Sequence, residues 1–259
     1  MGIFFEPYQA DSCCLCGSRG VLTGEHKIKA SALRKIFGKG EMMSISDFNG
    51  DGIPREAQGP KSRAFHFSAR MCSLCNGTRT QAADLEFDRF HILVSSAISE
   101  NQDPAIVFTL PQYTSGSEAY LNVFRYFSKL LCCHIADLYG PRPLAACEFA
   151  IGKKNQNIIS LRIDTDPNYA VFKDIFKEDK FASHGGLTVM CDGKTHNPES
   201  FQSSITLGEV RYTFWFRFEP VVENELHINH YEFWRKCVVA YQEALKNSSS
   251  NESFQNLGN

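Results

Sequence analysis

Four cysteines in two pairs have the spacing of metal ligands. Cys13 pairs with Cys16 and Cys72 with Cys75, each as Cys-x-x-Cys. Two intervening residues let both thiolates reach one ion from a tight turn, and two such turns complete a tetrahedral zinc site. Because four protein ligands leave no position for water, we expect this Zn²⁺ to be structural and not catalytic. The alternative is four unrelated buried thiols, and Cys14 adds a competing Cys-x-Cys spacing that suits such a turn less well.

An acidic residue, a histidine and an asparagine accompany these cysteines. Glu25-His26 lies between the two pairs, in TGEHKIKASALRK, and Asn76 directly follows Cys75. In this order and context the sequence resembles the HNH endonuclease superfamily in its zinc-stapled form. Those proteins place an acidic residue and histidine at the end of a strand. They place an asparagine or histidine at the start of the helix after the second Cys-x-x-Cys. The resemblance covers about residues 10–90, and nothing in the remainder is recognised.

The resemblance implies a ββα-metal, treble-clef-like fold, in which a catalytic cation lies between a two-stranded hairpin and a helix. Glu25 and Asn76 would hold Mg²⁺ or Mn²⁺ through oxygen ligands, and His26 would be the general base. Phosphodiester chemistry is consistent with these roles. Hydrolysis needs a cation to neutralise charge on the leaving oxygen, and a base that is active near neutral pH. The implied activity is hydrolysis of DNA, expected to be double-stranded. A lone histidine, by contrast, is more often a core or surface residue.

The sequence also departs from the family pattern. The central asparagine of the family name is missing from residues 62–72, where His66 lies near the expected place. His66 is a candidate for orienting the base or touching the phosphate, and a plain strand histidine is the equal alternative. Arg79 matches a basic residue of the family that would contact phosphate. Asp84 echoes an acid of some relatives, and we expect it to be structural.

Strand geometry places one condition on the Glu25-His26 pair. Neighbouring side chains on a strand point to opposite faces, so the two residues cannot face one site on a regular strand. A bulge or the strand end must turn them.

Basic residues flank the proposed site. Residues 26–40 hold five Lys or Arg and no acid, and residues 61–79 hold four and no acid. Such stretches are either solvated faces or phosphate-binding surfaces. Residues 91–259 instead carry 15 basic against 19 acidic residues, which argues against extensive DNA contact there. The candidates for DNA phosphate contact are Lys27, Lys29, Arg70 and Arg79.

The remaining chain must supply the elements that position this site. A helix is expected from near Cys75 through Phe90, and another over 117–140 with Ser117 as N-cap. Alternation of Val210, Tyr212, Phe214, Phe216 and Phe218 predicts a strand over 209–218. Further strands are predicted at 105–110, 157–163 and 186–191, and a closing helix at 230–246.

We therefore expect an α+β protein in three parts. Residues 1–90 form the zinc-stapled nuclease domain, residues 91–246 an α+β accessory domain of unrecognised fold, and residues 247–259 a disordered tail. The absence of an apolar run of eighteen residues and of a secretory signal predicts no membrane association and a cytoplasmic location. Of ten cysteines, five lie in the two clusters, which favours a metal site and buried thiols over disulfides.

Two other functions remain open. A zinc-stapled module that binds nucleic acid or protein without cutting would need none of Glu25, His26 and Asn76. A structural or adaptor subunit would instead use residues 91–246, through which a regulatory protein or a second copy would bind. Within the nuclease interpretation, family habit favours a bacterial defence or restriction nuclease.

Overall fold

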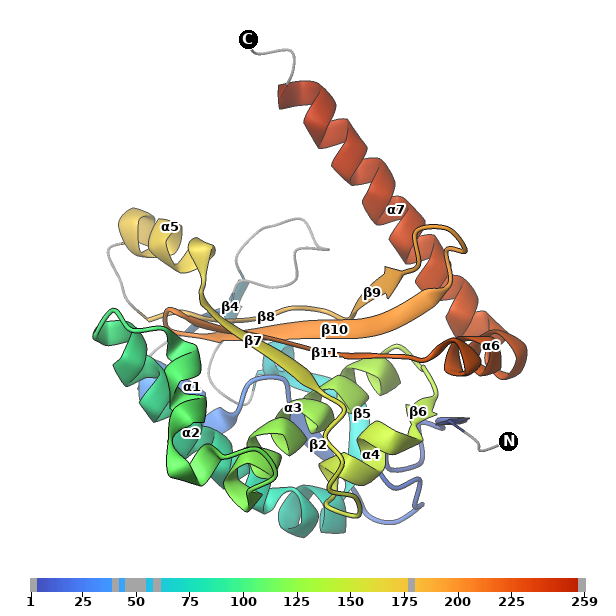
Figure 1. Cartoon of the computed structure of the whole chain (residues 1–259), viewed down its shortest axis with the longest axis horizontal. Coiled ribbons are helices and arrows are strands. Elements are labelled where there is room, and N and C mark those ends of the chain that lie inside the picture. Colours follow the sequence, from blue (N-terminus) through green and yellow to red (C-terminus); the bar gives the residue numbers. More distant parts are fainter. Residues whose placement is uncertain (1–3, 39–41, 45–54, 58–61, 177–179, 256–259) are drawn as a thin grey trace.

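A five-stranded antiparallel sheet crosses the molecule in the computed structural model, which describes residues 4–38, 42–44, 55–57, 62–176 and 180–255 (Figure 1). Its order begins with β7 (Ser160–Thr165), β11 (Val210–Arg217) and β10 (Pro198–Leu207). Both β8 (Ala182–His184) and β9 (Thr188–Cys191) then pair with the far edge of β10. The structure is thus mixed helix and sheet, as predicted.

The long strand β11 forms the middle of this sheet. It pairs with β10 from Val210 to Arg217 and with β7 from Val210 to Trp215. Its alternate side chains are buried, which confirms the predicted period of two: Val210, Tyr212, Phe214, Phe216 and, just beyond the strand, Phe218. These aromatic side chains are core and form no exposed partner surface.

The central helix α3 (Glu118–Asp137) lies under the sheet beside α2 (Gln81–Ser99) and α4 (Leu144–Ala150) (Figure 1). Ser117 is its N-cap, as predicted, since its side chain accepts the backbone N–H of Tyr120. All side chains from residue 121 to residue 136 are buried, so α3 is covered on every side. A helix buried all round places whatever polar groups it carries inside the protein.

The remaining elements surround this core. They are the strand pairs β1 (Phe5–Glu6) with β6 (Arg142–Pro143), β2 (Leu22–His26) with β5 (His66–Cys72) and β3 (Met42–Ser44) with β4 (Arg55–Ala57), and the helices α1 (Ala30–Phe37), α5 (Pro167–Phe176), α6 (Pro220–Asn229) and α7 (Tyr231–Gln255). Helix α7 projects away from the sheet on the side opposite α3 (Figure 1). It continues to Gln255 and so covers part of the tail for which the sequence predicts disorder.

The prediction of a strand over 105–110 is wrong. Residues Pro104–Thr109 form a 3₁₀ helix, because Asp103 caps the backbone N–H of Ala105 and Pro104 fixes a helical φ. The helix expected from near Cys75 begins instead as a π-helical turn, Cys75–Arg79, and α2 follows from Gln81.

Residues on both sides of the predicted domain boundary share one apolar core. Position 90 lies inside α2, and α3 packs against both β5 and the large sheet. The core cluster includes side chains from residue 5 to residue 237. Among the helices of the described residues, none is both long enough and apolar enough to cross a lipid bilayer.

Candidate functional site

Strands β2 and β5 form an antiparallel pair, called the hairpin below, although α1, β3 and β4 lie between them in the chain. This hairpin brings the two cysteine pairs together. Cys13 and Cys16 lie in the loop before β2, and Cys72 is the last residue of β5. The first turn closes with a hydrogen bond from the Gly17 N–H to the Cys13 carbonyl, 2.8 Å. Gly17 has φ +72°, a left-handed conformation that glycine adopts without strain.

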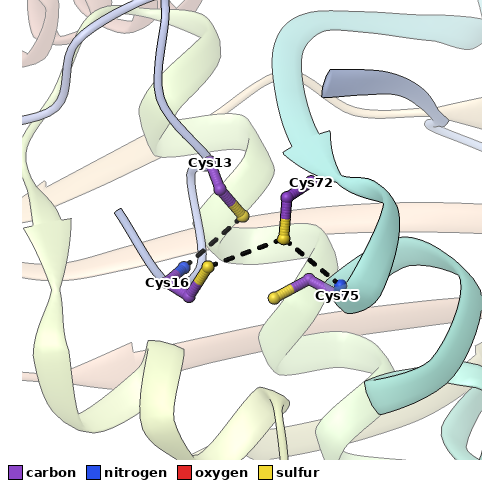
Figure 2. A group of neighbouring side chains, drawn as sticks. All are labelled: Cys13, Cys16, Cys72 and Cys75. Carbon is purple, nitrogen blue, oxygen red and sulfur yellow. Dashed lines mark hydrogen bonds between the residues drawn. The ribbon is translucent and has the colours of Figure 1, made fainter. Parts of the chain in front are cut away.

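The four sulfur atoms have the spacing of a tetrahedral metal site (Figure 2). All four Sγ atoms lie within 4.8 Å of one another, and those of Cys16 and Cys72 are 3.6 Å apart. Zinc–sulfur bonds of about 2.3 Å place tetrahedral ligands about 3.8 Å apart. The Cys16 N–H points at Cys13 Sγ (3.5 Å) and the Cys75 N–H at Cys72 Sγ (3.4 Å), as in a turn that stabilises thiolates. The cluster can therefore hold a metal ion such as zinc.

Arg79 lies against this cluster. Its Nη1 donates to Cys75 Sγ over 3.5 Å. Four thiolates around a divalent ion carry excess negative charge, which a guanidinium offsets. Arg79, predicted to contact phosphate, thus has a partner in the cysteine cluster.

The other nearby cysteines are not part of the cluster. Cys14 Sγ lies 3.7 Å from Cys133 Sγ, and Cys132 Sγ lies 3.7 Å from Cys147 Sγ. The hydrogen bond with Cys133 and burial raise the pKa of Cys14 well above its ordinary value. These cysteines are buried thiols, and the competing Cys14-x-Cys16 ligand spacing is not used.

A pocket of about 310 Å³ adjoins the hairpin and is lined by three of the four predicted catalytic residues, whereas His66 does not line it. Glu25, His26 and Asn76 line it together with Asp84. The rest of its wall comes from α1 and the residue before it, and from α3: Lys29, Ala30, Ser31, Arg34 and Tyr126. Acidic, imidazole, amide and basic groups therefore converge on one hollow.

An irregularity in the hairpin brings Glu25 and His26 to the same pocket. Gly24 pairs with Arg70 and His26 with His66, so β2 advances two residues where β5 advances four. The strict alternation of faces breaks at this point. This irregularity is the bulge that Glu25 and His26 need in order to face one site.

Glu25 forms a buried ion pair that the sequence did not reveal. Its Oε1 lies 2.7 Å from Nζ of Lys129, which also lies 2.6 Å from Oδ1 of Asp84. The Lys129 residue is 1% exposed. Burial alone would lower the pKa of Lys129, but the two carboxylates outweigh burial and raise it, so the amine is an ammonium ion. The one sequence indication was a lysine followed by an apolar run in a helix, Leu130 to Cys133.

Asn76 and His66 are held by the hairpin itself. The Asn76 amide donates to Thr23 Oγ1 (2.9 Å) and to the Gly24 carbonyl (3.0 Å), so its oxygen is the atom left to bind a ligand. The His66 ring packs against the His26 ring, with centroids 4.0 Å apart and the ring planes tilted by 43°. Its Nδ1 lies 2.9 Å from the Ser62 carbonyl, which only accepts, so Nδ1 carries the proton.

The basic residues predicted to contact DNA phosphate differ in their surroundings. Lys27 is 3.8 Å from Asp137 and lies over the Phe67 ring. Lys29 lines the pocket but pairs with Asp88 at 2.6 Å. Arg70 is exposed on β5. Arg34, one of the basic residues of 26–40 that sequence reasoning did not select, also lines the pocket.

Comparisons with protein-family models, with curated proteins and with solved structures found no match to this chain.

Proposed function

We propose that this chain is a zinc-stapled, metal-dependent endonuclease that hydrolyses DNA phosphodiester bonds with His26 as general base. The observation that carries the proposal is the convergence of Glu25, His26 and Asn76 on one pocket beside a four-cysteine cluster. Two features of the surroundings add support. The hairpin irregularity turns the adjacent pair to one site, and Arg34 adds positive charge to the pocket wall.

The donor set suits a hard divalent cation such as Mg²⁺ or Mn²⁺. Lys129 takes one oxygen of Glu25, which leaves the other carboxylate oxygen and the Asn76 amide oxygen as protein ligands. Such cations usually keep several waters and bind through one or two protein groups together with substrate phosphate. When bound, the cation would neutralise charge that develops on the leaving oxygen.

The protein's own residues supply the general base and the positive charge that attracts DNA. His26 accepts the proton of the attacking water, and the adjacent His66 ring, 4.0 Å away between centroids, limits the orientations open to His26. Arg34 and Arg70 attract the phosphate backbone, while the cysteine cluster fixes the distance between hairpin and helix.

Cleavage of supercoiled plasmid DNA in Mg²⁺ or Mn²⁺ tests the proposal. Wild type should cut, and His26→Ala should not, at equal zinc content. His227→Ala is the matched control, because His227 is exposed on α6 and away from the pocket, so this variant should cut like wild type.

Two results would count against the proposal. Equal cleavage by wild type and His26→Ala would remove His26 from the reaction. Failure of wild type to cut, with DNA binding that survives substitution of Glu25, His26 and Asn76, would favour a non-catalytic binding module.

A further inference from the structure

The acid pair of the pocket already holds a cation that belongs to the protein. Lys129 reaches from the middle of α3, and its Nζ lies 2.7 Å from Glu25 Oε1 and 2.6 Å from Asp84 Oδ1. Its ring neighbour is Tyr126, whose centroid lies 5.2 Å from Nζ. If the Lys129 ammonium moved away, the two carboxylates would lie close together without a positive charge between them and would repel each other.

The charges around this group define what else the pocket attracts. One ammonium between two carboxylates leaves a single negative charge at their centre. Lys29 brings no further net charge, since its Nζ contacts the Asp84 carbonyl at 2.5 Å and is paired with the Asp88 carboxylate at 2.6 Å. A second cation would therefore meet one net negative charge in place of the two that Glu25 and Asp84 would present without Lys129.

We propose that the Lys129 ammonium occupies the place between Glu25 and Asp84 that a divalent cation would otherwise take, and thereby keeps the affinity of the DNA-free pocket for such cations low. Lys129 is a positioning residue that acts through the two carboxylates. The role of this arrangement in catalysis rests on the proposed nuclease function: the catalytic cation would enter together with the substrate phosphate, which supplies the missing negative charge.

The test is Mn²⁺ binding to the zinc-loaded full chain without DNA, measured from the spin-resonance signal of free Mn²⁺. Wild type should bind weakly. Lys129→Met should bind at least about tenfold more tightly, because the loss of one fixed positive charge leaves two adjacent carboxylates. Lys129→Arg keeps the charge and should remain weak, and adding Glu25→Gln to Lys129→Met should abolish the gain.

Zinc content and thermal melts show which variants have folded. Lys129→Met that keeps zinc but binds Mn²⁺ no more tightly than wild type would overturn the proposal. Wild type that binds Mn²⁺ tightly, and loses it in Glu25→Gln, would overturn it without any Lys129 variant. Weak wild-type binding that Glu25→Gln does not change supports it even if Lys129→Met fails to fold. None of these results depends on DNA cleavage, so failure of the nuclease proposal is recognised separately.

Discussion

Removal of the buried Lys129 charge should destabilise the protein far more than removal of a surface charge. Lys129→Met leaves Glu25 and Asp84, whose side chains are 11% and 21% exposed, without their shared partner. Breaking a buried ion pair by removing one member costs about 3–5 kcal/mol. We expect a loss of this size in the free energy of unfolding, or a melting temperature lower by about 6–20 °C.

The assay is urea unfolding of zinc-loaded protein at pH 7 without added Mg²⁺ or Mn²⁺. The matched control is Arg235→Met, which removes an ion pair with Glu232 whose side chains are 58% and 75% exposed. That substitution should cost at most about 1 kcal/mol. A triple variant with Glu25→Gln and Asp84→Asn should regain part of the loss caused by Lys129→Met, because no unpaired charge remains buried.

A loss of about 1 kcal/mol or less for Lys129→Met, equal to that of Arg235→Met, would refute this reasoning. It would mean that water or a mobile pocket wall solvates the two carboxylates, and that the ammonium is not what holds them together.

Two further predictions concern the metal centre and acid stability. Cys72→Ser should lose bound zinc and much of the folding stability, while Cys191→Ser, which removes a buried thiol outside the cluster, should keep one zinc per chain by elemental analysis. A Cys72→Ser protein with full zinc would contradict the four-ligand site. Burial lowers the pKa of His91 from 6.5 to about 4. Between these pH values the unfolded chain therefore binds a proton at His91 that the folded protein does not bind. Stability should therefore be complete above pH 6.5 and fall by up to about 3 kcal/mol toward pH 4. His91→Gln should flatten that fall in unfolding curves, and an unchanged pH dependence would be the opposing result.

The sequence predicted those elements whose patterns are local. Ser117 followed by an apolar run defined α3, and alternating aromatic residues defined β11. It failed at residues 105–110, where an apolar run has no periodicity that separates a strand from a short helix, and where Pro104 and Asp103 decided the outcome. It also gave no indication that α3 would be buried on all sides, because burial depends on what packs around the helix.

The sequence predicted the four cysteines of the candidate metal site, but not the ion pairs that surround the pocket. Cys-x-x-Cys spacing identifies the cluster because the geometry lies within each turn. The contact of Lys129 with Glu25 joins residues 104 positions apart and depends on how α3 packs against the hairpin. Likewise the pairing of Lys27 with Asp137 is a tertiary contact, invisible in a stretch that carries only positive charge.

The most direct test of the central proposal is the rate at which wild type and His26→Ala cut a duplex DNA under single-turnover conditions, at matched zinc content and saturating Mg²⁺. Loss of a general base should slow cleavage by about 100-fold or more, with His227→Ala unchanged. Equal rates for wild type and His26→Ala would contradict the assignment of His26 as the base.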